Sequence, residues 1–355
     1  MVQNGFSWSI DIVNFTFGGI LVVLGGEFRQ ILSVIKWGDH AQVVGASLKY
    51  SPIWSYVEVH RLKINMRVLG FEGGDVLNQR EVTENLLRIG DGREHSFMHD
   101  GVAKISLPRI MCLESEKVDD LIAFAFPNIM ENYRGADFWR GRSICTPLND
   151  DVDFINAQVT KLFPGDVCTF YSANSVVDSN SNNVYPMEFL NTLQPSGCPP
   201  HKLVLKEGMI VILLCTLAYE SGICNGTRLI VQKLGRTIIE AEIVTGGNVG
   251  TRLIISGIPL VPTNPNQPFE FRRLQFPMKP VFTMSINKSE GQTMDAMGLY
   301  LSRPIFSHGQ FYVALLRVRS ASCVKVLIKD NSGCSWSEDD ICSYTENVIY
   351  KEVLQ

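Results

Sequence analysis

The chain has 355 residues, which is long enough for two or three domains, each with its own hydrophobic core. Hydrophobic residues make up 45% of the chain and charged residues 19%, a balance that excludes an intrinsically disordered protein. The formal net charge of −4 excludes a protein that binds nucleic acid through an overall basic charge, so any such surface must be a local patch.

The cysteine and hydropathy patterns indicate which kind of protein this is and argue against a secreted or membrane-spanning one. The nine cysteines are odd in number and no two have the C-x-x-C spacing of zinc or redox sites, so reduced thiols in an intracellular protein are the simplest interpretation. The start MVQNGFSWSI lacks the basic and apolar parts of a secretory signal. The longest apolar run, Met209 to Tyr219, is far shorter than the ~20 residues of a membrane helix. We therefore expect a soluble protein.

The first third of the chain predicts α/β structure. Ile20–Leu24 is a continuous apolar run with a glycine pair on each side, which is typical of a parallel strand buried on both faces. Apolar residues recur at helical spacings over Asp75–Ile89, and Gly90 closes that segment. Lys117–Tyr133 is a second helix candidate, which Pro127 interrupts.

A new unit begins near Arg140. Ser143–Thr146 reads as a short strand, and the apolar residues from Val152 to Leu162 then step by three, four and three, which is one face of a helix. Between about 167 and 280, short β-rich runs are separated by Gly, Asn and Pro, which indicates a small antiparallel barrel or sheet. The strand–turn–helix rhythm returns from Val281, so a β-rich block is inserted into an α/β unit. The last 25 residues are polar, and we expect them to pack loosely.

Three stretches carry residues suited to phosphate chemistry. Glu27, Arg29 and Gln30 follow the apolar run Ile20–Leu24, and in open α/β sheets ligands lie beyond the carboxyl ends of strands. A glutamine there can orient water or sense a γ-phosphate. The alternative is an ordinary polar loop after a core strand, and this stretch alone favours that alternative. The arginine in LKINMRV, Arg67, is by itself more simply a solvated side chain.

The third stretch is a pair of segments, SINKSEGQTMD (Ser285–Asp295) and GQFYVALLRVRS (Gly309–Ser320). The first reads as a strand ending in a polar, glycine-containing turn, and the second as a helix whose last turn carries Arg317 and Arg319. Arginines are favoured near helix C-termini by the helix dipole, which is a purely structural explanation. The functional alternative is an arginine finger directed at a phosphate.

A set of motifs in a fixed order makes the chain resemble the Pif-type (petite integration frequency) superfamily-one ATP-dependent DNA helicases, with the best match to the branch of Helitron transposons. The resemblance spans nearly the whole chain from about Asp11. Its motifs are GGEFRQILSVI, LKINMRV, TPLNDDVDFIN, YPMEFLNTLQPSGCPPHKLVLKEGMIVILL, CNGTRLIV, FPMKPVFTMSINKSEGQTMDAMGLYL and FSHGQFYVALLRVRS.

The resemblance implies a RecA-like P-loop NTPase helicase fold and roles for individual residues. These enzymes hydrolyse ATP between two RecA-like domains and move 5′ to 3′ along single-stranded DNA. Three catalytic positions follow: Gln30 as the γ-phosphate-sensing glutamine of the third helicase motif, Arg67 as the arginine of the fourth, and Arg317 as the arginine finger of the sixth. The remaining assignments are nucleotide contacts at Glu27, Gly291 and Gln292 and DNA contacts at Asn287, Lys288, Ser289 and Thr293.

The end of the β-rich insert offers a second candidate DNA surface. Aromatic and basic side chains interleave between Phe269 and Lys279, and such a mixture can stack bases and hold phosphates. Arg272 and Arg273 are the basic candidates. A barrel strand with two outward-pointing arginines is the simpler interpretation of the same pattern.

Two motifs of the family do not occur in the sequence. There is no G-x-x-x-x-G-K-[ST] phosphate loop, and no apolar strand ends in the Asp-Glu pair that holds Mg²⁺. The chain therefore resembles the C-terminal portion of the family. Three further positions depart from its pattern: Glu27 replaces aspartate, Glu290 replaces glutamine, and Leu316 replaces serine.

These expectations give a domain plan. Residues 1–139 are expected to be a truncated remnant of the first RecA-like domain with an open sheet edge, since a parallel strand needs neighbours on both sides. Residues 140–166 and 281–330 form the second RecA-like domain, 167–280 the inserted barrel, and 331–355 a polar tail.

Three hypotheses follow: two that assign a function to the chain and one that assigns none. The first is a 5′-to-3′ DNA helicase of replication, recombination, repair or telomere maintenance that uses ATP and Mg²⁺, is inactive as this chain alone, and works with a polypeptide that supplies the N-terminal half. The second is a catalytically dead remnant that binds single-stranded DNA or a protein partner; the third is a transposon-derived fragment without function. The nucleus is the expected location, with the mitochondrion as the alternative.

Overall fold

The structure of the chain is a computed structural model. The structure describes residues 16–62, 76–94, 96–99, 102–176, 185–195, 197–262, 269–329 and 341–355. Contacts divide the chain into two compact units, each assembled from separate segments. The first unit comprises Met1–Ser106, Ile305–Leu315 and Tyr344–Gln355, and the second comprises Leu107–Pro304 and Leu316–Ser343.

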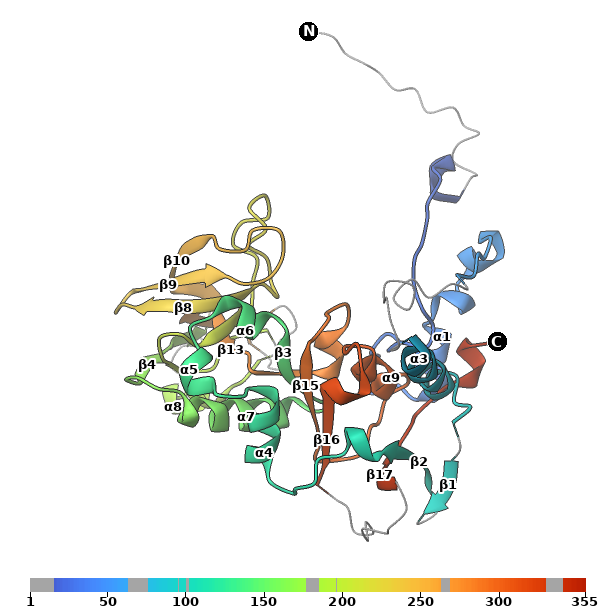
Figure 1. The fold of residues 1–355 in the computed structure, drawn as a ribbon. Helices are drawn as coiled ribbons and strands as arrows, with labels where there is room; N and C mark the ends of the chain where they lie inside the picture. Colours follow the sequence, from blue (N-terminus) through green and yellow to red (C-terminus); the bar gives the residue numbers. More distant parts are fainter. Residues whose placement is uncertain are drawn as a thin grey trace. The chain divides into compact units, whose positions relative to one another are not determined.

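A four-stranded parallel sheet forms the centre of the second unit. Its strand order is β14-β3-β15-β16 (Figure 1). All six residues of β15 are buried, as expected for a parallel strand with covered faces. The predicted return of strand–turn–helix rhythm is confirmed. The strand bounds are Arg142–Thr146 for β3, Thr283–Ser285 for β14, Ala296–Leu301 for β15 and Val324–Ile328 for β16.

Two helices pack against this sheet. Helix α4 (Val118–Ala125) contacts β15, and helix α7 (Asn149–Leu162) contacts β14. A Cβ at Gly298 would lie 3.0 Å from Leu121 and 3.1 Å from Ile144, so the glycine lets α4 approach the sheet closely. The predicted break at Pro127 is confirmed, because α4 ends before it. The following helices are α5 (Ile129–Asn132) and α6 (Ala136–Arg140).

Aromatic side chains fill the core between α6, α7 and the sheet. The fully buried Trp139 ring stacks on Phe163 at 5.8 Å and packs on Phe126 and Phe282 at 5.4 Å each. Its indole N–H donates to the Tyr133 carbonyl at 2.6 Å, which satisfies the one polar group of the buried ring. This cluster fixes the start of β3, which follows α6 directly.

The insert between α7 and β14 is antiparallel, as predicted. Its largest sheet has the order β10-β9-β8-β7-β13, of which β8, β9, β10 and β13 are labelled in Figure 1, and two smaller sheets have the orders β11-β12-β5 and β4-β6. One short helix, α8 (Met187–Thr192), lies within it. The strand bounds are Cys168–Tyr171 (β4), Ala173–Val176 (β5), Lys202–Leu205 (β6), Ile210–Leu213 (β7), Arg228–Leu234 (β8), Ile238–Ile243 (β9), Arg252–Ser256 (β10), Ile258–Leu260 (β11), Phe271–Gln275 (β12) and Met278–Pro280 (β13).

Alternating side chains build the core of the insert. In β9 and β12 every second residue is buried, which is the period of a strand with one covered face. The buried cluster includes Leu205, Leu213, Leu229, Val231 and Ile239, each no more than 1% exposed. The insert therefore has a core of its own within the second unit.

The first unit is mainly helical where the structure describes it. Helix α3 (Val76–Gly90), which confirms the helix predicted from Asp75, contacts helix α9 (Gln310–Leu315), all six of whose residues are buried. Helix α1 (His40–Gly45) begins at a capping box formed by Asp39 and Gln42. A small sheet has the order β1-β2-β17. The strand bounds are Ser96–His99 (β1), Val102–Pro108 (β2) and Ile341–Glu346 (β17).

The predicted strand at Ile20–Leu24 is wrong for this structure. The segment has no regular secondary structure, and its five apolar side chains are between 41% and 90% exposed. An apolar run specifies burial only where neighbouring strands cover it, and no strand pairs with it among the described residues. The C-terminal segment was expected to pack loosely, but Val353 is fully buried. Asn347 donates to the Ile89 carbonyl, and the Tyr350 N–H donates to His308.

The division into units differs from the predicted plan. The second unit starts at Leu107 rather than near Arg140, and residues 305–315 group with the first unit. The reason is that Cys112 forms a parallel bridge with Val326 of β16 and that α4 packs on β15. The segment before Arg140 therefore belongs with the parallel sheet of the second unit.

Candidate nucleotide and DNA site

The turn Glu27–Gln30 carries the first group of candidate residues. Tyr312 of α9 donates from its hydroxyl to Glu27 Oε1 at 2.6 Å, and Gln30 Nε2 donates to Glu27 Oε2 at 3.0 Å. The backbone closes the turn through the Gln30 N–H and the Glu27 carbonyl at 3.1 Å. Both predicted residues therefore lie together, with the Gln30 amide oriented by the Glu27 carboxylate.

An ion pair ties the same turn to the end of α3. Arg29 Nε lies 2.5 Å from Asp91 Oδ1, and Arg93 also pairs with Asp91. Burial raises the pKa of Asp91, but its hydrogen bonds from Arg29 and Arg93 outweigh burial and hold that pKa below its ordinary value. Burial and the charge of Glu27 raise the pKa of Tyr312, so its hydroxyl stays a donor.

Two residues before α9 support the turn from behind. A Cβ at Gly309, which has φ of +68°, would lie 2.2 Å from the Arg29 carbonyl oxygen, so only glycine allows this approach. His308 is buried, and its Nδ1 accepts from the Tyr350 N–H at 2.7 Å. Nε2 must then carry the proton, which it donates to the Phe28 carbonyl at 2.8 Å. Sequence reasoning missed His308, although it stands directly before the glycine in FSHGQ.

The segment Asn287–Thr293 lies in the second unit, after β14. The 3-10 helix η6 (Ile286–Ser289) leads into Gly291 at φ of +78°. Lys288 and Thr293 are exposed, whereas Ser289 is buried and its hydroxyl donates to the Ile286 carbonyl at 2.7 Å. The polar turn predicted from the sequence is thus confirmed, with some side chains turned outward and others holding the turn.

Arg317 holds this segment from within. Its guanidinium is 5% exposed, and Nη1 donates to the carbonyls of Gln292 at 3.2 Å and Ser289 at 3.4 Å. Burial raises the pKa of the neighbouring Cys145 thiol to about 12, so no thiolate stands beside the arginine at neutral pH. The predicted arginine finger and the predicted DNA segment are therefore in direct contact, while Gln30 belongs to the other unit. Arg67 lies outside the described residues.

The two arginines of β12 point in opposite directions. Arg272 is exposed, whereas Arg273 is fully buried. Its guanidinium donates to Asn174 Oδ1 at 2.8 Å and to the carbonyls of Pro199 and Leu193 at 2.9 Å each. The interpretation of two outward arginines is thus wrong for Arg273, which connects β12 to the loops around α8.

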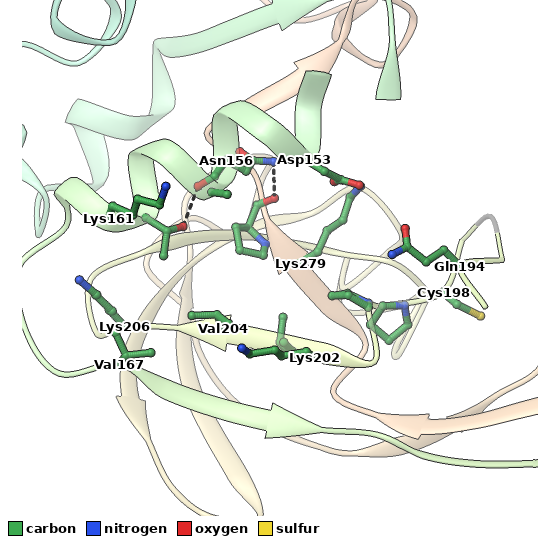
Figure 2. A pocket seen from close by; sticks show the side chains of 16 residues that line it. Asp153, Asn156, Lys161, Val167, Gln194, Cys198, Lys202, Val204, Lys206 and Lys279 are labelled. Atoms are coloured by element: carbon green, nitrogen blue, oxygen red, sulfur yellow. Dashed lines mark hydrogen bonds and ion pairs between the residues drawn. The ribbon is translucent and has the colours of Figure 1, made fainter. Parts of the chain in front are cut away.

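A groove lined by lysines was not predicted. It has a volume of about 500 Å³ and lies between α7, β6 and β13, with an apolar floor that includes Leu203 and Pro280. Figure 2 shows that its cationic side chains come from α7, from β6 and the residue that follows it, and from β13. They are Lys161, Lys202, Lys206 and Lys279, of which Lys206 donates to the Phe163 carbonyl and Lys279 lies 3.9 Å from Asp153. Burial and the positive charge of Lys279 lower the pKa of Lys288 on η6.

The comparison with known families identifies the chain. The family model described as PIF1-like helicase matches residues 8–100, and the model described as the 2B domain of DNA helicase Pif1 matches residues 188–234. The chain is 33% identical to the ATP-dependent DNA helicase PIF1 of Rattus norvegicus over 315 residues and 33% identical to that of Homo sapiens over 329 residues. The chain belongs to the Pif1-like helicases. Each alignment covers 88% of the chain and 41% of the relative, so the chain spans about two fifths of these relatives.

Solved structures agree on the fold. Pif1 from Bacteroides bound to ssDNA matches with a TM-score of 0.56 at 18% identity, over 88% of this chain and 63% of that chain. Pif1 helicase from Candida albicans matches with a TM-score of 0.55 at 20% identity, over 88% of this chain and 66% of that chain. The RecA-like fold expected from the sequence is confirmed, with the parallel sheet of the second unit as its described core.

The described residues hold no ready cation site. No group of three or more His, Cys, Asp or Glu side chains within them could bind a metal ion. The two mammalian relatives are named as ATP-dependent DNA helicases. Among the same residues, no helix is long and apolar enough to cross a membrane.

Proposed function

We propose that this Pif1-like chain supplies the single-strand-binding and phosphate-sensing parts of an ATP-dependent, 5′-to-3′ DNA helicase. The observation that carries the proposal is the hold of Arg317 on the segment 289–292, which links the predicted finger of the sixth motif to the predicted DNA contacts of the fifth. A movement of either group is transmitted to the other through these two hydrogen bonds.

The proposed DNA surface combines cations with an outward turn. Lys288 and Thr293 are exposed on the 287–293 segment, and Lys279 lies near Lys288 at the lysine groove. Lysines next to a shallow groove attract the phosphates of a single strand and release counterions on binding. The Ser289 hydroxyl holds the turn through the Ile286 carbonyl, Asn287 is a further proposed DNA contact, and Arg272 extends the basic surface on the insert.

The proposed nucleotide-facing group is the Glu27–Gln30 turn. The Glu27 carboxylate holds the Gln30 amide in one orientation. A side chain that senses a γ-phosphate needs a fixed orientation, because it must respond to one position of that phosphate. Glu27, Gly291 and Gln292 are the proposed nucleotide contacts, and Arg67 and Arg317 the proposed charge-stabilising arginines. The phosphate loop and the Mg²⁺ ligands come from a segment that these 355 residues do not contain, on the same or on another polypeptide, in a compartment that holds DNA.

A second candidate is binding without catalysis. One observation that favours it is the burial of Arg317, whose guanidinium already donates to backbone carbonyls. The other is the exposed negative charge of Glu290, which would repel a phosphate bound at the segment 287–293. In this alternative the second unit still binds a single strand, but no nucleotide reaches the arginines.

The experiment is a titration of a fluorescent 20-nucleotide oligo(dT) with the full chain at several salt concentrations, beside an assay of ATP hydrolysis. We expect binding that weakens with salt, and Lys288→Ala should lower the slope of log affinity against log salt by about 1. Lys233→Ala is the matched control, since Lys233 is an exposed lysine on β8 of the same unit. Absence of salt-dependent binding would reject both candidates. Binding without ATP hydrolysis, even when a polypeptide carrying the phosphate loop is added, would favour the second.

A further inference from the structure

Arg228, at the start of β8, is a buried cation without a counter-ion. Its side chain is 3% exposed, Nη2 donates to the Arg142 carbonyl at 3.3 Å, and Nε has no hydrogen-bond partner among the described residues. Burial lowers its pKa to about 10, with only the nearby Cys145 opposing that shift. A guanidinium is normally buried together with a carboxylate or phosphate, because its desolvation is otherwise uncompensated.

The wall of a polar pocket includes this arginine. The pocket has a volume of about 560 Å³ and lies where β8 and the β9–β10 turn of the insert meet the segment 292–293 and the end of α6. No carboxylate lines it among the described residues, and two arginines and two threonines do. Its lining residues are Arg140, Gly226, Arg228, Thr245, Gly246, Val249, Gln292 and Thr293.

The mouth of the pocket carries Arg140, which is paired with a carboxylate on its outer side. Arg140 is half-exposed; its Nε donates to the Val244 carbonyl at 3.2 Å, and its Nη1 lies 2.9 Å from the exposed Asp137. Gly226 and Gly246 have φ near +90°, and a Cβ on either would meet no atom within 4 Å, so the rim leaves room for a ligand. The volume is that of a site for a nucleotide-sized ligand rather than for a single ion.

We propose that this pocket binds a backbone phosphate, with its attached sugar, of the single strand that runs along the segment 287–293. The inference rests on the proposed DNA function, which it deepens by naming the insert as part of the same site. The strand phosphate supplies the negative charge that Arg228 lacks, Arg140 donates to it from the mouth, and the Thr293 hydroxyl adds a neutral donor. Guanidinium groups suit phosphate better than ammonium groups because several N–H donors lie in one plane.

The pocket lies where the insert meets segments that flank the RecA-like sheet of the second unit. Arg228 comes from the insert, Arg140 ends α6, and Thr293 follows the turn after η6. A phosphate there bridges all three segments, so strand binding is expected to stabilise the unit as a whole.

The test compares Arg140→Ala and Thr293→Val with Arg236→Ala, an exposed arginine on the turn between β8 and β9. Arg140 and Thr293 are exposed, so their variants are expected to fold; Arg228→Met is added as a buried variant and kept only if its far-ultraviolet spectrum matches wild type. Two quantities are measured: affinity for oligo(dT) over a range of salt, and the rise in melting temperature in inorganic phosphate against chloride at equal ionic strength.

The expected result is that Arg140→Ala weakens oligo(dT) binding about threefold to tenfold, lowers the salt slope by about 1 and removes the phosphate-dependent rise in melting temperature. Arg236→Ala should change none of these. If Arg140→Ala removes the phosphate effect but leaves oligo(dT) affinity intact, the pocket takes free phosphate and the strand assignment is overturned. If neither quantity changes, the pocket binds no phosphate. Wild type that responds to phosphate but binds no oligo(dT) would reject the DNA function instead, so the two failures are distinguishable.

Discussion

Ile20–Leu24 in the first unit and β15 in the second are both short apolar runs, but they differ in what surrounds them. Every residue of β15 is buried between parallel neighbours and α4, whereas Leu21 and Val23 are 90% and 86% exposed. The same kind of sequence therefore forms a core strand in one unit and an uncovered segment in the other. Hydrophobic pattern indicates what a segment can bury, and only its neighbours decide whether it does.

The two units consequently depend on different interactions. In the second unit the sheet and the Trp139 cluster bury large apolar side chains, and polar contacts are added to that core. In the first unit the turn that follows the exposed run is held by polar groups: the Glu27 carboxylate, the Arg29–Asp91 ion pair and the His308 imidazole. This contrast predicts that apolar truncations act mainly on the second unit and polar ones on the Glu27–Gln30 turn.

The largest expected effect is that of Leu299→Ala in the centre of β15. The side chain is fully buried, and truncation of a buried leucine leaves a cavity that costs about 2–5 kcal/mol in the free energy of unfolding. Leu21→Ala removes the same atoms from a side chain that is 90% exposed, so a change within about 0.5 kcal/mol is expected. Urea unfolding of both variants is the measurement. Similar losses for the two would mean that Ile20–Leu24 is covered in solution and that the contrast is wrong.

The next effect concerns a polar group inside the apolar second unit. Arg273→Ala would leave the carbonyls of Pro199 and Leu193 and the Asn174 side chain without their donor, at about 1–3 kcal/mol. Arg272→Ala, one residue away and exposed, should change stability by less than about 0.5 kcal/mol. Thermal unfolding separates the two. Equal effects would show that the buried guanidinium does not anchor the loops around α8.

The pair Arg272 and Arg273 also shows how far the sequence could lead. Helices α3 and α7 and strands β3, β8 and β16 were predictable because their apolar spacing is local. Arg273 was not, although Phe271, Arg273 and Gln275 share one face of β12 by simple alternation and the first is a buried aromatic. The two-residue period of a strand, applied from the apolar Phe271, predicts that Arg273 is buried and that Arg272 is the exposed DNA-contact candidate.

Sites assembled from distant segments were beyond local reasoning. The lysine groove takes its cations from positions 161, 202, 206 and 279, and the phosphate pocket joins Arg228 to Arg140 and Thr293. No spacing in the sequence brings these together; only the topology of the insert does. Gln30 and Arg317 were marked by local patterns, a strand end and a helix C-terminus, but only the family resemblance favoured a functional role over a structural one.

A smaller effect is expected at Tyr312 in the first unit. Tyr312→Phe keeps the buried ring but removes the hydroxyl that donates to Glu27, and a hydrogen bond to a carboxylate contributes about 1–2 kcal/mol. Tyr50→Phe is the control, since Tyr50 is 54% exposed. Hydrogen exchange of the amides in the Glu27–Gln30 turn is the sharper measurement, because loosening there should exceed any change in β15. Uniform exchange in variant and wild type would show that the carboxylate does not hold the turn.

The smallest effect is the pH dependence contributed by His308. Burial lowers its pKa below the ordinary 6.5; the hydrogen bond with Phe28 and the charge of Glu352 oppose this shift, and His40 adds to it. The unfolded chain therefore takes up a proton more readily, so the stabilisation is complete above pH 6.5 and is lost as the pH falls through the lowered value. The loss should be at most about 1 kcal/mol between neutral pH and about pH 5.5.

Protonation at Nδ1 would break the hydrogen bond from the Tyr350 N–H, so the acid effect should centre on the Glu27–Gln30 turn and the C-terminal segment. His201 in the second unit also has a pKa lowered by burial, with the same sign, so the slope of wild type does not identify the residue. The slope of His308→Gln does, since glutamine keeps a side-chain donor for the Phe28 carbonyl but does not titrate. A flatter dependence of unfolding free energy on pH in this variant is expected, and an unchanged slope would assign the acid sensitivity to the second unit.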